Sequence, residues 1–531
     1  MNAEEMGLLD SSESGALSVD EALDIAGGFS KYQHRLMLYL GAAIAASSAH
    51  MLVPIFLIPR MMASWQLSAG ASSLQSSVFF LGYIIGVFFW AGVSDSRGRR
   101  PATTTAFALG NLSGIASFFA PNYLLFVMLR CVCGIGIAGA KNGCFILATE
   151  LAPPAARSRV GALISYAWFA GLLYLVATAW MLQHLHWRWL VLAYVPAIGV
   201  QAILSSAIPE SPRYLLVCDQ KGTDGPDMAK QVLLSVFKAN GRSPPEPFTL
   251  RRPPATADSH DSLRAGSSRG RDGAGGPAVG GGANASTFAQ LWQPGVRRQT
   301  AVVGFCQGVC TMVFYALTFD PRANAAAGDL YLGALLGALV ELPAYALLAP
   351  LTNGLGRKTA YSFFLALSAL CLFALHLALA ADDAQPSARA ASAAAGRADG
   401  AAQVAKAAMH QANWQVVAYA LGGRFASVAA TNVAYIVAAE VYPTTCRNSA
   451  VGWGTGCGRV GAIVAPALML GMDQPLILFV ALSLIASALV WLLPETAGVR
   501  LADVRSLGRG RCSTPELESD EKLSLVQSDR I

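Results

Sequence analysis

Charged residues are scarce in this 531-residue chain, and their scarcity excludes a water-soluble globular fold. Asp, Glu, Lys and Arg make up 13% of the sequence, hydrophobic residues make up 54%, and the mean hydropathy is +0.46. A soluble domain carries about a quarter charged residues. Apolar spans of about 20 residues, the length that crosses a hydrocarbon core, recur along the chain. We therefore predict an integral membrane protein.

Three further signals are missing. No GxxxxGK(S/T) phosphate-binding loop occurs, which disfavours an ATP-driven pump. The opening MNAEEMGLLDSSESG is polar and acidic rather than basic and then apolar, so we expect no cleaved signal peptide. The ten cysteines fall mostly within apolar spans or on the expected cytoplasmic side, so no disulfide framework is implied. Neither an enzymatic activity nor a cofactor is expected.

The apolar residues fall into twelve intervals in two sets of six, which predict an all-α membrane protein with twelve transmembrane helices. The first set is 35–58, 73–93, 102–119, 123–148, 159–181 and 187–208; the second is 298–319, 329–351, 359–381, 413–438, 449–471 and 474–493.

The loops predict the orientation, because cytoplasmic loops carry an excess of Lys and Arg. Basic residues concentrate after the second, fourth, eighth and tenth intervals, which places both termini in the cytoplasm. The net charge of +6 fits this bias and a basic loop, and no nucleic-acid partner is expected. The predicted parts are a cytoplasmic tail (1–34), a six-helix half (35–208), a partly disordered cytoplasmic loop (209–297), a second half (298–493) with an extracellular alanine-rich insert (382–413), and a cytoplasmic tail (494–531).

The two halves repeat each other. GVSDSRGRR and ELAPPAAR follow the second and fourth intervals, and TNGLGRK and EVYPTTCR follow the eighth and tenth. Glu150 and Glu440 each precede an arginine by seven residues, and the sixth intervals end at PESPR and PET. Gly98 and Glu150 are 52 positions apart and Gly356 and Glu440 are 84 apart; the excess equals the 32 residues of the insert. Repeated six-helix halves with a site between them are an architecture of alternating-access transporters.

These landmarks identify a family resemblance. GVSDSRGRR resembles the loop signature of the major facilitator superfamily, and GALVELPAY, YIVAAEVYPTTCRNSAVG and GRVGAIVAP look like its organic cation, anion and carnitine transporter branch. The resemblance implies the major facilitator fold, with two pseudo-symmetric halves. The chain departs from the branch in having a short loop after the first helix, Asn353 where the first half has Asp95, and no acidic residue in the first helix.

The resemblance implies a gating role for the charged residues of the repeated loops, since ion pairs there hold one conformer and break in another. The alternative is that they only orient the loops. The expected first cluster is Asp95, Arg99, Glu150 and Arg157, and its counterpart is Arg357, Glu440 and Arg447.

Three charged residues lie near the predicted midplane, where a lone charge costs about 3 kcal/mol and should face a cavity or a partner. They are Lys141, Glu341 and Arg459, and all three are candidate substrate-binding residues. In the resembled family, an arginine at the position of Arg459 goes with anion or zwitterion carriers. The alternative is that Glu341 neutralises Lys141 or Arg459 as a structural pair.

Several uncharged polar or aromatic residues complete the predicted site. Tyr315, beside Phe314, could stack on a substrate or simply pack in the core. Asn142 and Asn432 are related by the repeat, each eight residues before its glutamate, and could bind substrate or backbone. His50 is a weaker candidate for ion coupling.

The sequence thus predicts a monomeric carrier of small organic anions or zwitterions in the lipid bilayer, with H⁺, Na⁺ or an exchange anion as candidate coupled species. We expect the plasma membrane, with an endosomal or vesicle membrane as the alternative. Two other functions stay open at this point: a sugar or other metabolite porter, and a non-transporting receptor-like or vesicle membrane protein.

Overall fold

The computed structural model describes residues 16–191, 196–217, 225–251, 291–293, 296–320, 326–394, 413–442 and 447–496. Helices occupy all twelve predicted intervals. In the first half they are α3 (Lys31–Leu52) with α4 (Pro54–Trp65), α5 (Ala69–Arg97), α6 (Arg99–Ala116) with the short η1 (Ser117–Phe119), α7 (Tyr123–Glu150), α8 (Arg157–Met181), and α9 (Trp187–Val191) with α10 (Pro196–Ala207).

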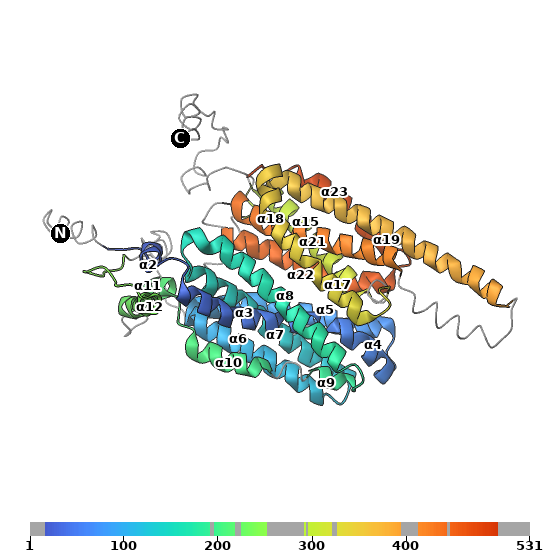
Figure 1. Ribbon diagram of the computed structural model, residues 1–531, viewed down its shortest axis with the longest axis horizontal. Helices are drawn as coiled ribbons and strands as arrows, with labels where there is room; N and C mark the ends of the chain where they lie inside the picture. Colours follow the sequence, from blue (N-terminus) through green and yellow to red (C-terminus); the bar gives the residue numbers. More distant parts are fainter. Residues whose placement is uncertain are drawn as a thin grey trace, which may run out of the picture.

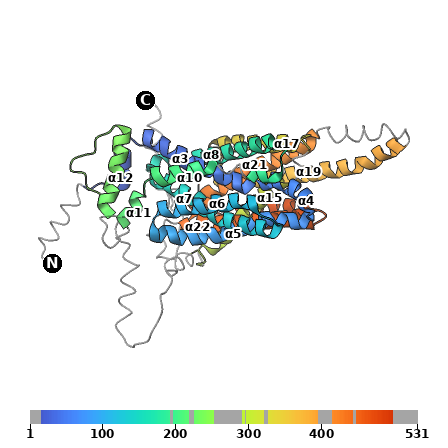
Figure 2. The same ribbon diagram turned by 90° about the horizontal axis from the view of Figure 1, so that it is seen from below.

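The second half repeats this order. Its helices are α15 (Arg297–Phe319), α17 (Leu330–Leu339) with α18 (Glu341–Leu355), α19 (Arg357–Ala394), α21 (Trp414–Val441), α22 (Arg447–Gly471) and α23 (Pro475–Val490). Among the described residues, seven helices are long and apolar enough to cross a membrane. The helix α19 continues through the first part of the alanine-rich insert and projects beyond the bundle (Figures 1 and 2).

Equivalent helices of the two halves make equivalent contacts. In the first half α6 packs on α7 and α3 packs on α8; in the second, α19 packs on α21 and α15 packs on α22. The halves meet where α22 packs on α5 and where α8 packs on α17 and α18. Figure 1 shows the first half below the second. This is the predicted pseudo-symmetric arrangement.

Two predicted spans are interrupted at proline-containing sites. The first divides at Val53, before Pro54, and the eighth divides at Val340, two residues before the Leu342-Pro343 pair. Proline has no N–H to donate to the carbonyl four residues earlier. The breaks therefore have a local sequence cause.

Large apolar side chains cover the outside of the bundle. Phe88 on α5, Leu370 on α19 and Leu484 on α23 are each at least half exposed, which in water would promote aggregation. Trp180, Trp414 and Trp491 are exposed at helix ends, as in membrane-interface belts. The surface fits a lipid environment.

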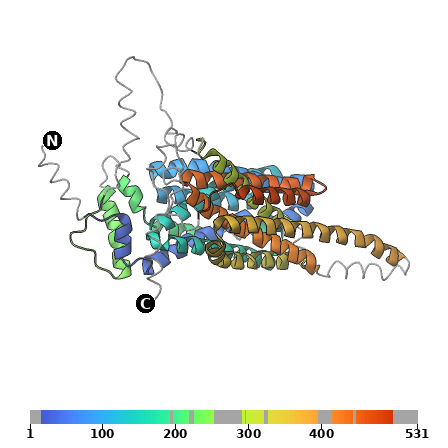
Figure 3. The same cartoon turned by 90° about the horizontal axis from the view of Figure 1, so that it is seen from above.

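A small helical unit lies at one end of the bundle, seen at the left of Figures 1 and 3. It consists of α2 (Val19–Ile25), α11 (Pro212–Val217) and α12 (Gly225–Asn240). The Asn240 side chain ties it to α3, accepting from Tyr32 N at 2.9 Å and donating to Ala26 O at 2.9 Å. The repeated loops, with residues 97–100 and 357–358, lie at this same end, which we call the motif end; the opposite end is the far end.

Candidate functional site

Arg459 lies on the boundary between the halves. Its helix α22 packs on α15 within the second half and on α5 of the first. The Arg459 side chain is 6% exposed, its Nη1 donates to Tyr315 Oη at 3.1 Å, and its guanidinium lies 4.4 Å from the centre of the Tyr83 ring. Phe80 packs on Tyr315 with ring centres 4.6 Å apart. Aromatic faces from both halves thus enclose one guanidinium.

Among the described residues, this guanidinium has no carboxylate counter-ion. No Asp or Glu of the described residues lies within 4.0 Å of it, and its buried Nε has no hydrogen-bond partner. A planar guanidinium binds carboxylate through two parallel N–H donors. Cation–π contacts offset part of the cost of burying its charge. An anion would supply the missing acceptor.

Lys141 brings a second positive charge to the same region. Its ammonium lies 4.6 Å from the centre of the Trp168 ring on α8, and no described carboxylate pairs with it. Its helix α7 packs on α5, the helix that α22 of Arg459 also contacts.

Glu341 does not neutralise either of them. It is fully buried, its Oε1 accepts from Arg424 Nη2 at 2.8 Å, and its Oε2 accepts from Tyr345 Oη at 2.8 Å. The alternative, a structural pair with Lys141 or Arg459, is therefore wrong, because α18 presents Glu341 to Arg424 on α21 of its own half. A substrate contact by Glu341 stays a prediction. Both carboxylate oxygens already have partners.

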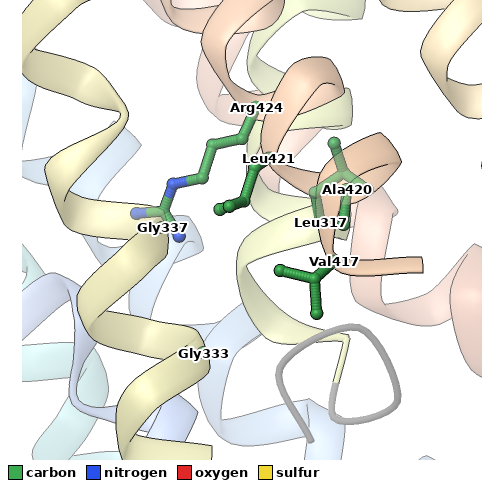
Figure 4. A pocket seen from close by; sticks show the side chains of 7 residues that line it. All are labelled: Leu317, Gly333, Gly337, Val417, Ala420, Leu421 and Arg424. Carbon is green, nitrogen blue, oxygen red and sulfur yellow. The ribbon is translucent and has the colours of Figure 1, made fainter. Parts of the chain in front are cut away.

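A small cavity adjoins this ion pair, and Figure 4 shows the Arg424 side chain reaching into it. A Cβ added to Gly337 would lie 2.7 Å from Arg424 Nη1, so glycine makes room for the guanidinium. The cavity offers about 20 Å³, which suits a single water molecule. It is too small for an organic solute.

Among the described residues, the two predicted asparagines and Phe314 make no hydrogen bond or cation–π contact with Arg459. The Asn432 Nδ2 donates to Val428 O at 2.8 Å on its own helix. Asn142 is half-buried on α7, next to Lys141. Phe314 lies under Arg424, at 5.2 Å, rather than under Arg459. A substrate contact by either asparagine stays a prediction.

The loop clusters at the motif end form within each half. Arg99 Nε lies 3.8 Å from Glu150 Oε1 in the first half, and Arg357 Nε lies 3.3 Å from Glu440 Oε2 in the second. Thr496 Oγ1 also donates to Glu440, at 2.6 Å. The side chains of Asp95, Asn353 and Arg447 lie outside the described residues.

Arg157 has a different partner from the one expected. The predicted cluster joins it to Glu150, but its Nη2 donates to Asp20 Oδ1 at 2.8 Å, and Arg213 donates to the same oxygen. Asp20 belongs to α2, which opens with a capping box in which Ser18 and Glu21 bond reciprocally. The capping box is visible in the sequence; the packing of α2 beside α8 is not.

Two glutamates that sequence reasoning identifies only as landmarks cap equivalent helices. Glu210 accepts from Arg99 N at 3.0 Å at the start of α6, and Glu495 accepts from Arg357 N at 2.9 Å at the start of α19. Each helix follows a glycine with positive φ, at +107° for Gly98 and +85° for Gly356. A Cβ at Gly98 would lie 2.3 Å from Glu210 Oε2.

Burial raises the pKa of the Glu210 carboxyl, although the backbone N–H groups that donate to it oppose the rise. A carboxylate at a helix N-terminus also complements the helix dipole. The repeated Pro-Glu sequences thus anchor the start of the third helix in each half.

Comparison with known proteins decides the family. The sequence profile of the Major Facilitator Superfamily matches residues 38–414. The chain belongs to this superfamily. One relative is organic cation/carnitine transporter 7 of Arabidopsis thaliana, which is 25% identical over 92% of this chain and 96% of its own length. Another is the organic cation transporter protein of Drosophila melanogaster, which is 26% identical over 86% of this chain and 76% of its own length. Solute carrier family 22 member 15 of Xenopus tropicalis is 27% identical over 85% and 75%.

Solved structures support the same fold. The inward-open xylose transporter XylE from E. coli has a TM-score of 0.60 with 15% identity, covering 88% of this chain and 98% of its own. Its partially occluded inward-open form has a TM-score of 0.61 with 16% identity, covering 89% and 100%. At this identity the likeness concerns the fold alone. The predicted family, branch and fold are confirmed, and the chain is an integral membrane transporter of the major facilitator type rather than an enzyme.

Proposed function

We propose that this transporter carries small organic anions, or zwitterions held by their anionic end, and that Arg459 is the anchor for the anionic group. The observation that carries the proposal is a guanidinium only 6% exposed, at the boundary of the halves, with no carboxylate partner among the described residues. Buried charges are paired or face a binding partner. The free Nε edge of Arg459 suits a carboxylate or sulfate.

The charges around Arg459 favour an anion over a cation. Lys141 on α7 adds a second cationic side chain, and Glu341, a buried acid of the second half, is bonded to Arg424. An ammonium group near Arg459 would meet two like charges and lack an acidic partner. The names of the relatives include both cations and carnitine, so the charge balance of this chain separates it from the cation carriers among them.

We propose alternating access as the mechanism. Two contacts join the halves toward the far end: Phe56 stacks on Tyr331 with ring centres 5.5 Å apart, and Ser77 Oγ donates to Ile463 O at 3.0 Å. The described ion pairs of the repeated loops join helices within one half. By the Lys and Arg excess, the motif end faces the cytoplasm. The halves would then be closed on the outside.

The ion pairs Arg99–Glu150 and Arg357–Glu440 serve as gating contacts in this proposal. They stabilise a state only to the extent that they differ between the inward-facing and outward-facing forms. The expected location is the plasma membrane, with both termini in the cytoplasm. H⁺, Na⁺ or an exchange anion is the candidate coupled species.

Ligand-induced thermal stabilisation of the purified protein tests the substrate class. The probes are benzoate, L-carnitine, tetraethylammonium and xylose, with wild type, Arg459→Ala and the control Arg97→Ala, which removes an exposed charge at the motif end. An anion at 100 times its Kd should stabilise wild type and the control by about 2.7 kcal/mol and leave Arg459→Ala unmoved. Stabilisation by tetraethylammonium or xylose alone, or an undiminished benzoate effect in folded Arg459→Ala, would overturn the proposal.

A further inference from the structure

The first membrane helix contains a break whose backbone needs an outside donor. The helix α3 ends at Leu52 and α4 begins at Pro54. A residue at position 54 of a continuous helix would donate its N–H to the carbonyl of His50, and proline cannot. A carbonyl without its helical donor is costly inside a membrane.

Arg130 of α7 supplies the donor. Its Nη2 donates to His50 O at 2.5 Å, and its side chain is only 1% exposed. Its guanidinium lies 4.6 Å from the centre of the Phe79 ring on α5, and no Asp or Glu in the described part of the chain pairs with it. An arginine so deeply buried and directed at one carbonyl indicates a positional role.

The His50 side chain fixes the same point from two other sides. One ring nitrogen, Nε2, is 3.0 Å from Asn111 Oδ1 on α6, and the other, Nδ1, is 3.4 Å from Cys133 Sγ on α7. A Cβ added to Gly114 would lie 2.5 Å from the His50 ring, so the ring fits closely against α6. The end of α3 is thereby held on α6 and α7.

The segment beyond the break carries the far-end contact between the halves. On α4, Phe56 stacks on Tyr331 of α17, and Arg60 donates to the Tyr331 hydroxyl and to Leu182 O at 3.3 Å. The equivalent first helix of the second half, α15, runs unbroken from Arg297 to Phe319. Among the described helices, the position of α4 relative to α3 therefore bears directly on the far-end closure.

We propose that Arg130 is a positioning residue that replaces the backbone donor lost at Pro54, and that by holding the His50 carbonyl it fixes α4 in the position that closes the far end. The proposal concerns the shape of the first helix and does not depend on the substrate. It requires that a restored backbone N–H at position 54 make Arg130 dispensable.

Hydrogen–deuterium exchange of the full chain in lipid nanodiscs tests this, read on peptides covering residues 50–60. Loss of one buried hydrogen bond should raise exchange there about tenfold in Arg130→Met. Adding Pro54→Ala should return exchange close to the wild-type rate, because the backbone N–H that this substitution restores can bond to His50 O. The matched control adds Pro59→Ala, the other proline within α4, whose replacement would restore an N–H to a different carbonyl.

Rescue by Pro54→Ala but not by Pro59→Ala is the expected result. Unchanged exchange in Arg130→Met, or equal behaviour of the two proline substitutions, would overturn the proposal. If Arg130→Met does not yield folded protein, Arg130→Met with Pro54→Ala should, and failure of that double variant where Arg130→Lys folds would also contradict it.

Discussion

Equivalent positions in the two halves join their helices in different ways near the membrane midplane: by an ion pair in the second half and by close backbone packing in the first. Tyr83 and Glu341 each lie 15 residues before the glycine of the repeated loop, and Gly134 and Arg424 each lie 16 residues before the loop glutamate. In the second half these positions form an ion pair at 2.8 Å. In the first, the backbone of α7 approaches α5 so closely that a Cβ on Gly134 would lie 2.1 Å from Phe79 O.

In the proposed function, this difference accounts for the positive charge at the boundary. The second half uses its acid internally, and the first half presents the Tyr83 ring to Arg459 at 4.4 Å. One repeat thus contributes a neutral pair and the other an aromatic platform. In the proposed function, this asymmetry leaves Arg459 and Lys141 to bind an anion.

The largest expected effect comes from breaking the ion pair. Glu341→Gln or Arg424→Met alone should cost about 3–5 kcal/mol, because either leaves a buried charge uncompensated. The double variant Glu341→Met with Arg424→Met should lose much less. Thermal unfolding of purified protein measures the stability of all three variants. If the loss in the double variant equalled the sum of the two single losses, Glu341 and Arg424 would not be energetically coupled.

Gly134→Ala tests the close approach in the first half. The added methyl has no room beside Phe79 O, so we expect a loss of about 1–3 kcal/mol. Gly92→Ala on α5 is the control, because a Cβ there meets nothing within 4 Å. Equal thermal stability of the two variants would mean that α5 and α7 can separate without cost.

Lys141→Met tests the shared field of the two cations. Removing a membrane-embedded charge that has no described carboxylate partner should stabilise the unliganded protein slightly and weaken anion binding by about three- to tenfold, or about 0.7–1.4 kcal/mol. Titration calorimetry with the anion found in the thermal screen measures the second effect. Tighter anion binding in the variant would show that Lys141 does not contribute to anion binding.

The smallest effect compares the two capping glutamates. Glu210→Gln should cost about 1 kcal/mol and Glu495→Gln less, because Glu210 is half-buried whereas Glu495 is exposed. Thermal unfolding of the two variants at one pH gives the comparison. A larger loss for Glu495→Gln would show that burial does not set the value of the cap.

Helix positions could be predicted from the sequence because each apolar interval has the length of a membrane crossing, and even the break at Pro54 has a local cause. The depth of Arg459 could be counted along its helix. The partner of Glu341 could not be predicted from the sequence, because it depends on how α18 is rotated about its axis against α21. The contact of Asp20 with Arg157 joins residues 137 positions apart, and no local pattern encodes it.

That last contact changes how the first thirty residues should be treated. Asp20 accepts hydrogen bonds from Arg157 and Arg213, while the backbone at Leu17 bridges to Leu250. The segment from Leu17 to Asp20 therefore binds both the start of α8 and the segment after the sixth helix. Deleting residues 1–30 to improve expression would remove these contacts. A shortened protein should therefore keep everything from Leu17 onward.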